Sequence, residues 1–277
     1  MNAKNGEILA IWSSPTFNAN IIDEEWSTWL VDDKAPLLNR ATQGNYELGN
    51  LSSIFYYGYA TENLFEFERE IFVNNTKCAS PLPSNQSNNF QLALINGCSA
   101  ANDVFSQWQN PVLTETLLQK YMWTENIEFD LPIQPVTSPT NLSVQSLNSI
   151  QFSPFQIARS SAAFSNSGLV PYPKLSLAVN SPEQGWIVFP SKEPVQILDR
   201  SAANQTALYF ARNDFPTWEI TSTNFSEEQP IHWYVSGTLP NWQAAPMVFV
   251  LTLETGNSID ARNIGREVME KILTSSN

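Results

Sequence analysis

Short β-rich runs crowd the second half of this sequence, and they constrain its fold more than any other feature. Seven such runs, separated by Pro, Asn and Gly, follow residue 170: LSLAV, GWIVF, PVQIL, TALYFA, TWEIT, IHWYVSG and APMVFVLTLE. Apolar runs bounded by turn residues are typical of strands. Behind them, a closing amphipathic helix is predicted by apolar residues at helical spacing, namely Ile259, Ile264, Val268, Met269 and Ile272.

The middle of the chain has helical character instead. Residues 52–73 are helical in composition, and FQLALINGCSAANDVFSQW predicts one helix broken near Gly97 or two short helices. Pro111 fits the first turn of a further helix. In SPFQIARSSAAFSNSG, Ser153 is the expected N-cap and Gly168 the expected end. Core packing, not a ligand platform, is expected for the aromatic residues Phe55, Tyr56, Tyr57, Tyr59, Phe65 and Phe67.

One more strand is expected at residues 6–12, GEILAIW, far in sequence from the others. A sheet region made of residues 1–15 and 170–277, with a helical region over residues 45–168, gives a layered α/β domain whose sheet comes from both chain ends. The 277 residues, 42% of them hydrophobic, can bury one substantial core, so a single domain is expected over residues 1–277. The abrupt start at an apolar run suggests a piece of a longer protein.

The acidic composition excludes several functions. The formal net charge is −13, and such a surface repels a phosphate backbone, so nucleic acid is not an expected partner. No run of about 18 apolar residues is present, so no membrane-spanning helix is expected. No signal peptide is evident, and a membrane contact would need an anchor upstream of Met1.

Metal and cofactor chemistry is not indicated. The single histidine, His232, and the cysteines Cys78 and Cys98 form no pattern typical of zinc or iron ligands, and no phosphate-binding glycine loop occurs. We therefore predict no metal and no cofactor. His232, beside Trp233 in a strand pattern, is expected to be structural. The cysteines either form one disulfide or remain buried free thiols, and the sequence leaves both alternatives open.

Five segments, taken in order, carry a family resemblance. They are GEILAIWSSPTFNAN, PLLNRATQGNYELG, PFQIARSSAAFSNSG, WYVSGTLP and PMVFVLTLE. In order and spacing, and over nearly the whole chain, the sequence resembles the transpeptidase domain of high-molecular-weight penicillin-binding proteins, in the serine β-lactamase and D,D-transpeptidase superfamily. The resemblance implies an antiparallel sheet packed against helices. It also implies a location at the extracytoplasmic face of a bacterial cell membrane.

The same resemblance implies an acyl-transfer site built from three motifs. Ser-x-x-Lys at a helix start supplies a serine that attacks a D-alanyl-D-alanine peptide or a β-lactam, and its lysine, one turn on, takes the serine proton. Ser-x-Asn on a neighbouring helical loop relays protons and holds the substrate amide. Lys-Thr-Gly, or Lys-Ser-Gly, on a strand binds the substrate carboxylate and pairs with the peptide as an added strand.

This sequence departs from the first motif at both functional positions. The family pattern Tyr-x-x-Gly-Ser-x-x-Lys aligns with YELGNLSS, residues 46–53, which puts Asn50 at the nucleophile and Ser53 at the lysine. An amide is not a nucleophile under these conditions, and Ser53 cannot serve as the base. None of the seven lysines follows a serine by three residues, so a shifted frame does not restore the motif.

The second motif falls in NGCSAANDVF, in one of two frames. One frame places Gly97 and Ser99 at the two polar positions and loses both polar groups of the motif. The other frame, over residues 100–102, keeps only Asn102. Other Ser-x-Asn matches, at residues 87–89 and 146–148, are expected by chance in a chain this rich in Ser and Asn, and neither is expected at the site.

The third motif is also lost. The likeliest match in WEITSTNF is Ile220, Thr221 and Ser222, so that the lysine is replaced by Ile and the glycine by Ser. Loss of the cation removes a charge-assisted contact with a substrate carboxylate. A serine in place of glycine puts a side chain where a peptide backbone would approach.

The sequence therefore predicts a penicillin-binding-protein transpeptidase-like domain without catalysis, because losing a nucleophile alone costs about a million-fold in rate. Such a pseudoenzyme would act as a scaffold or interaction module in peptidoglycan synthesis or cell division. Its expected partners are other cell-wall synthesis or division proteins.

Three alternatives remain. The old cleft could bind peptidoglycan stem peptides without acylation, or the chain could be an active D,D-transpeptidase whose nucleophile is misaligned. An enzyme could also reuse the cleft through other side chains, with Glu47, Ser52, Ser53 and Asp103 as candidates. An open cleft would favour the binder, whereas a cleft filled by side chains such as Leu48 and Ile220 would favour the scaffold.

Overall fold

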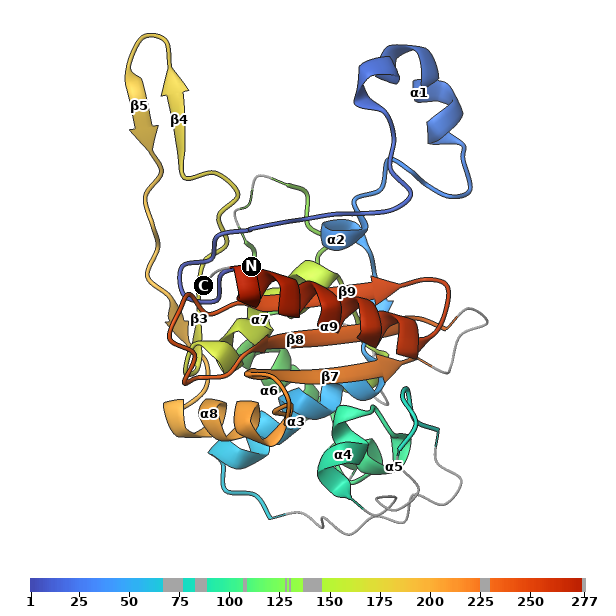
Figure 1. Cartoon of the computed structure of the whole chain (residues 1–277), viewed down its shortest axis with the longest axis vertical. Coiled ribbons are helices and arrows are strands. Elements are labelled where there is room, and N and C mark those ends of the chain that lie inside the picture. The colour runs from blue at the N-terminus through green and yellow to red at the C-terminus, as the bar shows by residue number, and fades with distance from the viewer. Residues whose placement is uncertain are drawn as a thin grey trace.

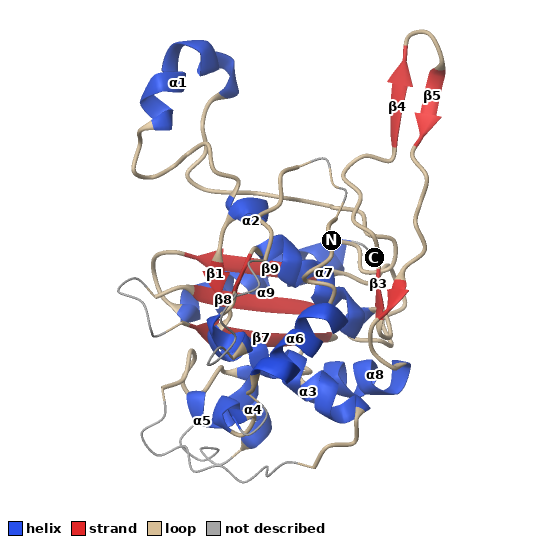
Figure 2. Ribbon diagram, turned by 180° about the vertical axis from the view of Figure 1, so that it is seen from behind, coloured by secondary structure: helices blue, strands red, loops and turns tan. Residues whose placement is uncertain are grey.

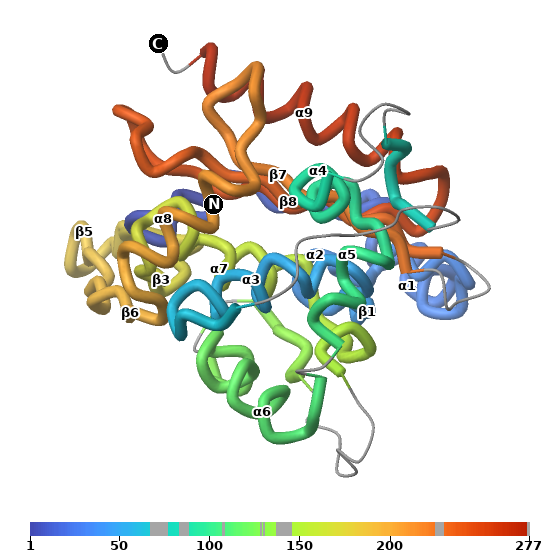
Figure 3. Tube along the Cα trace, turned by 90° about the horizontal axis from the view of Figure 1, so that it is seen from below, coloured from blue at the N-terminus to red at the C-terminus, as the bar shows by residue number. Residues whose placement is uncertain are grey.

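An antiparallel sheet between two helical layers forms the body of the protein (Figure 1). The computed structural model describes residues 1–66, 77–82, 89–106, 109–127, 129, 131–136, 146–224 and 230–275. Helix α9 (Ser258–Ser275) covers one face of the sheet, and α3 (Ser52–Glu62) and α7 (Pro154–Ser165) lie on the other, as the perpendicular view in Figure 3 shows. The predicted layered α/β class with an antiparallel sheet is confirmed.

The sheet consists of β7 (Thr217–Thr223), β8 (His232–Thr238) and β9 (Val248–Leu253), in that order. Every residue of β7 and β8 is buried, which is possible because helices cover both faces. The strands predicted from TWEIT, IHWYVSG and APMVFVLTLE are thus confirmed. Their β-branched and aromatic residues suit a pleated surface that is packed on both sides.

Helix α9 forms as predicted, but the prediction of its buried face is wrong in part. Met269 is buried, whereas Ile259 and Ile264 are 46% and 44% exposed. The helix packs instead through small residues, because a Cβ on Gly265 would lie 2.0 Å from the Tyr234 ring. The large aromatic residue on β8 therefore selects a small-residue face of the helix, which apolar periodicity alone does not reveal.

The predicted core packing is confirmed for Phe55, Tyr56 and Tyr57 of α3, but it is wrong for Phe65, which follows the end of the helix and is 43% exposed. The Phe55 ring lies 4.8 Å from Trp123 and 4.9 Å from Tyr121, and the Tyr121 hydroxyl donates to the Phe55 carbonyl. The helix is shorter than the predicted 52–73, since it ends at Glu62. Residues 67–73 lie outside the described residues, and with them the predicted core residue Phe67.

The remaining helices of the middle follow their sequence signals. FQLALINGCSAAND forms two short helices, α4 (Phe90–Ile95) and α5 (Ser99–Asp103), and α6 (Pro111–Lys120) begins at its proline. Helix α7 starts with a capping box in which Ser153 and Gln156 satisfy each other's backbone amides. Gly168, at φ +90°, follows the helix as predicted.

The predicted strand at residues 6–12 is wrong. Gly6, at φ +80°, turns the chain toward Lys174, whose backbone exchanges hydrogen bonds with Gly6 and Ile8, and no strand follows. The sheet still receives the chain start, because Asn2 bridges Met247 beside β9. Both ends of the chain therefore meet at the sheet, but through residues before the predicted strand.

TALYFA is also not a strand, since it lies in helix α8 (Arg200–Tyr209) and the turn after it. The buried residues of this segment are spaced at helical intervals: Ala202, Ala203, Thr206, Ala207 and Phe210. Alanines at this spacing pack closely against α3 and α7. The β-forming residues Tyr209 and Phe210 misled the sequence prediction because the preceding helix-forming residues decide the local structure.

Shorter elements complete the fold. They are η1 (Ala19–Ile21), α1 (Ile22–Leu30), α2 (Arg40–Gln43), η2 (Gly49–Leu51), η5 (Leu147–Ser149), the pair β1 (Tyr46–Glu47) and β2 (Gln151–Phe152), the pair β3 (Leu169–Val170) and β6 (Val195–Gln196), and the hairpin β4 (Ala178–Ser181) and β5 (Gly185–Val188). The β4–β5 hairpin and α1 stand off from the layered body at the same end of the molecule (Figure 2). LSLAV, GWIVF and PVQIL each contribute to one of these short strands.

Candidate functional site

Three segments that carry the predicted motif positions meet beside β7. They are the turn η2 at the start of α3, the connection between α4 and α5, and the middle of β7. Their backbones are in direct contact, because a Cβ on Gly97 would lie only 2.2 Å from the Thr221 carbonyl oxygen. Gly97 adopts φ +59°, which a residue with a side chain would disfavour. The fold thus brings together positions from residues 50, 97 and 221.

The two positions of the first motif are occupied by groups that bond to neighbouring backbone. The Asn50 side-chain amide donates from Nδ2 to the Gly97 carbonyl at 2.9 Å. Ser53 is buried, and its hydroxyl donates to the Asn50 carbonyl at 2.8 Å. Neither contact prepares a nucleophile, since a general base must hold the proton of an attacking hydroxyl.

Ser52 lies in a polar cluster that sequence reasoning did not find. Its hydroxyl lies 2.5 Å from Asn148 Oδ1, 2.9 Å from the Gly49 carbonyl and 3.2 Å from Asn102 Oδ1. The expectation that Ser146–Asn148 falls away from the site is therefore wrong, because η5 brings Asn148 beside η2. The Ser-x-Asn spacing at residues 146–148 was the sequence signal for this position. Because the chain is rich in Ser and Asn, that spacing could not be distinguished from a chance match. Residues 87 and 88 of the other match lie outside the described residues.

The side chains of β7 at the third motif also bond to neighbouring backbone. Ile220, Thr221 and Ser222 are all fully buried. The Thr221 hydroxyl lies 3.1 Å from the Ile95 carbonyl, and the Ser222 hydroxyl donates to the Leu48 carbonyl at 3.1 Å. Strand β7 is thereby joined to both segments that face it. Leu48 and Ile220 belong to the main hydrophobic core.

A buried carboxylate holds β7 from the other side. Glu219 is 1% exposed and accepts hydrogen bonds from Arg262, Arg266 and Tyr234, of which the two arginines come from α9. Burial alone would raise the pKa of Glu219, but the arginines outweigh burial and lower it. Arg262 also donates from Nη1 to Asn96 Oδ1 at 2.6 Å. Helix α9 is thus tied to β7 and to the residue before Gly97.

A disulfide fixes the same connection. Cys78 and Cys98 are bonded, so the free-thiol alternative is wrong. Backbone hydrogen bonds flank the bond: Ser99 N donates to Lys77 O at 2.9 Å, and Ala79 N donates to Gly97 O at 3.3 Å. The Gly97 carbonyl therefore accepts from both Ala79 and Asn50. Closing this loop of 20 residues stabilises the fold by about 3 kcal/mol.

The candidate residues for a reused cleft do not assemble into an acid–base pair. Glu47 accepts from Asn224 Nδ2 at 2.7 Å, and Asp103 lies exposed at the end of α5. Partial burial of its carboxyl raises the pKa of Asp103, but among the described residues no hydrogen bond joins it to Ser52 or Ser53. His232 is buried, with Nδ1 3.0 Å from the Thr223 hydroxyl, and burial lowers its pKa.

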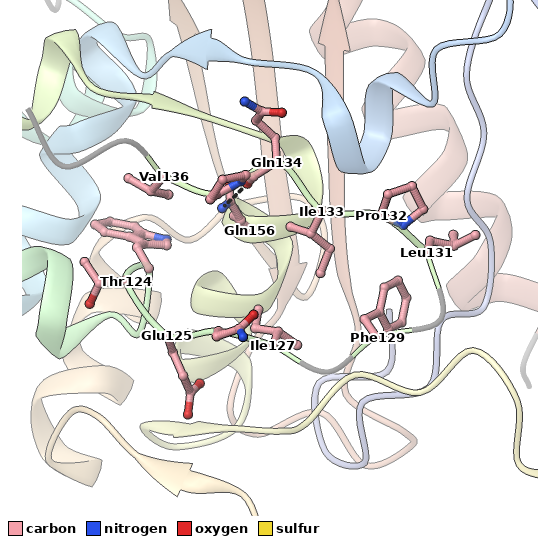
Figure 4. Close-up of a pocket in the computed structure, with 13 residues that line it drawn as sticks. Thr124, Glu125, Ile127, Phe129, Leu131, Pro132, Ile133, Gln134, Val136 and Gln156 are labelled. Carbon is pink, nitrogen blue, oxygen red and sulfur yellow. Dashed lines mark hydrogen bonds between the residues drawn. The ribbon is translucent and has the colours of Figure 1, made fainter.

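A cavity of about 390 Å³ lies elsewhere, between residues 123–136 and α7 (Figure 4). Its lining combines apolar side chains with polar ones, among them Gln156, whose amide donates to the Gln134 carbonyl at 3.0 Å. None of the eight motif positions lines this cavity, and its described lining holds no serine, cysteine or lysine. The one hydroxyl side chain of this described lining is that of Thr124, and the lining contains no lysine or histidine that could act as its base.

The described residues contain neither a metal-ligand cluster nor a membrane-spanning helix. No group of three or more His, Cys, Asp and Glu side chains there could hold a metal ion. Within the same ranges, no helix has the length and apolar character needed to cross a membrane.

Comparisons with known proteins identify relatives of this fold. A family model described as "Penicillin binding protein transpeptidase domain" matches residues 1–208. The D,D-transpeptidase domain of a peptidoglycan glycosyltransferase from Eggerthella lenta is similar in structure, with TM-score 0.73 and 17% identity over 98% of this chain and 76% of that one. Penicillin-binding protein A from M. tuberculosis, as an imipenem acyl-enzyme complex, gives TM-score 0.73 and 18% identity over 99% and 72%.

A further similar structure is that of a peptidoglycan synthase complex that coordinates polymerization and crosslinking. It gives TM-score 0.65 and 19% identity, and covers 97% of this chain and 54% of that chain. A comparison with curated protein sequences finds no match. At identities below 20%, the structural similarities establish the fold, and the transpeptidase-like architecture expected from the sequence is confirmed.

Proposed function

This chain belongs to the penicillin-binding protein transpeptidase domain family, and from that premise we propose that it acts without catalysis, as a scaffold or interaction module in peptidoglycan synthesis and cell division. Residues 1–277 act as one transpeptidase-like domain in this proposal. The contact between Gly97 and the Thr221 carbonyl is the observation that carries it. The segments that would flank a substrate touch each other there.

The first support is chemical. On the proposed alignment, Asn50 replaces the nucleophile, and its amide donates to the Gly97 carbonyl. Ser53 replaces the lysine and has no basic nitrogen that could take a proton. Loss of the nucleophile in a cooperating catalytic unit lowers the rate by about a million-fold. These replacements leave no acyl-transfer mechanism at these positions.

The second support is energetic, and it argues against a stem-peptide binder. A peptide that added to β7 would have to separate the Asn50–Gly97, Thr221–Ile95 and Ser222–Leu48 hydrogen bonds. Each net hydrogen bond contributes about 1 kcal/mol, so opening costs about 3 kcal/mol. That cost weakens binding by roughly a hundredfold. The missing lysine removes the charge-assisted contact that would offset it.

The proposed setting follows from the family and from the disulfide. The structural similarity to a peptidoglycan synthase complex supports cell-wall synthesis or division proteins as partners. Disulfides persist in oxidising compartments, so the Cys78–Cys98 bond supports a location at the extracytoplasmic face of the membrane. Both inferences are consistent with the expectations from sequence.

Intact-mass spectrometry after long exposure to a reactive penicillin tests the absence of catalysis. An active penicillin-binding protein, treated in parallel, serves as the positive control. We expect no mass gain for this chain, because Asn50 cannot form an acyl ester. A stoichiometric adduct would overturn the proposal, and peptide mapping of the adduct would then identify the activated serine.

A further inference from the structure

Helix α1 and its flanks form an arm that the rest of the described chain does not cover. The arm, residues 12–34, stands off from the layered body (Figures 1 and 2). None of the residues of α1 is buried. Trp12 and Val31 are 74% and 77% exposed, and Trp26 and Leu30 are 49% and 64% exposed.

The apolar residues of α1 form one face. Ile22, Trp26, Trp29 and Leu30 follow the spacing i, i+4, i+7, i+8, which places them on one side of a helix. Trp26 and Leu30 are exposed, whereas Ile22 and Trp29 are half-buried. Helices in proteins derive most of their stability from packing such a face, and an isolated helix of nine residues is unstable in water. The ring contact between Phe17 and Trp29, at 5.4 Å, lies within the arm itself. A cluster of exposed large apolar side chains marks an interaction site.

Charge identifies the chemistry of the partner. Residues 12–34 contain five carboxylates and one lysine, which leaves a net charge of −4. Asp23, Glu24 and Glu25 lie in the first turn of α1, and Asp32 and Asp33 follow its end. The apolar face is therefore bordered by acidic groups at both ends. Interfaces commonly combine an apolar centre with a polar rim, and complementary charge selects the partner.

The negative charge of the arm disfavours two other binding partners. A second copy of this chain would bring an equally acidic arm, on a molecule of net charge −13. An anionic membrane surface attracts basic segments and repels acidic ones. A partner whose apolar surface is bordered by lysine or arginine can bury the apolar face of α1 and pair with the carboxylates of the arm.

We propose that the α1 arm docks a basic amphipathic segment of a partner protein, with apolar side chains on Trp26 and Leu30 and cationic side chains against Asp23–Glu25 and Asp32–Asp33. This inference deepens the proposed function and rests on it, since it assigns the surface through which the interaction module acts.

A designed peptide pair tests the inference directly. One helical peptide of about 18 residues, long enough to form a helix, carries leucine on one face and lysine on the other, and its twin carries glutamate in place of lysine. Fluorescence anisotropy of labelled peptide, titrated with the whole chain, gives Kd. The Leu/Lys peptide should bind at least about tenfold more tightly than the Leu/Glu peptide, and added salt should weaken it.

Two variants locate the binding surface. The double variant Trp26→Ser/Leu30→Ser should weaken binding of the Leu/Lys peptide by about tenfold or more. It should still fold, because neither residue is buried. Trp186→Ser is the matched control, since it removes another exposed tryptophan, 72% exposed, from the β4–β5 hairpin. Residues 174–193, which include that hairpin, contain two lysines and two glutamates, so the control should leave Kd unchanged.

Several results would overturn the inference. Equal affinity for both peptides would remove the charge argument, and an equal effect of Trp186→Ser would mean nonspecific apolar binding. A dimer of the protein alone that Trp26→Ser/Leu30→Ser abolishes would identify a second copy as the occupant. Phosphatidylcholine vesicles that bind as tightly, with the same sensitivity, would identify a lipid surface. Each result leaves the penicillin experiment unaffected, so failure here is distinguishable from failure of the proposed function.

Discussion

Removing the Glu219 carboxylate should destabilise the protein more than loss of any surface ion pair. Glu219 lies in the middle of a buried strand and receives both arginines of α9. Replacement by alanine leaves Arg262 and Arg266 facing a low-dielectric interior without their shared partner. It also removes the acceptor for the Tyr234 hydroxyl, which lies 3.1 Å from Oε2.

The expected magnitude follows from burial. Breaking a buried ion pair by removing one partner costs about 3–5 kcal/mol. Arg262 and Arg266 are 18% and 33% exposed, so they can turn partly toward water, and Glu219→Ala should cost about 3 kcal/mol, at the lower end of that range. Glu219→Gln keeps the shape and one acceptor, so it should cost less than Glu219→Ala.

The pH dependence has a definite sign. The folded-state pKa of Glu219 is lowered, so its ionised form stabilises the folded protein above the unfolded pKa of about 4.3. That contribution is lost as pH falls through the lower folded-state pKa. The stability difference between the wild-type chain and Glu219→Gln should therefore be largest near neutral pH and shrink below about pH 4.

Urea unfolding, followed by tryptophan fluorescence at neutral and acidic pH, measures both effects. Glu267→Ala is the control, because Glu267 pairs with Lys271 on the exposed side of the same helix. It should leave the unfolding midpoint unchanged. A cost below about 1 kcal/mol for Glu219→Ala, or a Glu219→Gln difference independent of pH, would refute the reasoning.

Three further outcomes follow from the same contacts, each measured by urea unfolding. Gly97→Ala should lower the free energy of unfolding by about 3 kcal/mol or more, because its Cβ would meet the Thr221 carbonyl. Gly185→Ala, at φ +71° with nothing within 4 Å of its Cβ, should lower it by about 1 kcal/mol. Equal losses of stability would contradict the close approach at Gly97. Replacing Cys78 and Cys98 by serine should cost about 3 kcal/mol, and an unchanged midpoint under reducing conditions would contradict this. Ser153→Ala should cost about 1 kcal/mol through loss of the capping box, and a neutral result would show that the cap is dispensable.

Short sequence signals correctly predicted the starts of helices α6 and α7, which depend on residues that are neighbours in sequence. Ser153, Pro154 and Gln156 define the start of α7 by themselves, and the start of α6 follows from Pro111. The segment at residues 6–12 has an apolar pattern that suits a strand, but a strand also needs a neighbour with free backbone groups. The chain start pairs with β9 through Asn2 instead, a long-range contact that no local pattern contains.

The candidate site was also predicted only in part, since the motif positions were recognised and the contacts of Glu219 were not. Motif alignment singled out Asn50, Gly97 and Thr221 in three separate segments, and the fold brings these three positions close together. The Glu219 network was missed, although a signal existed. An acidic residue between Trp218 and Ile220 in a buried strand needs a cationic partner. Arginines at 262 and 266, one helical turn apart, supply it, but only the packing of α9 on the sheet decides the pairing.

The motif positions beside β7 and the α1 arm differ in whether their side chains already have partners within the protein. At the motif positions, Asn50, Thr221 and Ser222 bond to backbone carbonyls of adjoining segments, and Ser53 bonds to the carbonyl of Asn50 in its own segment. A buried hydroxyl or amide without a partner costs about 1–3 kcal/mol, so these bonds keep the segments together and leave the polar groups without a need for substrate. On the α1 arm the opposite holds, because its apolar face stays in water. If binding is driven by surface that is not yet buried, the capacity to bind lies at α1 and not beside β7.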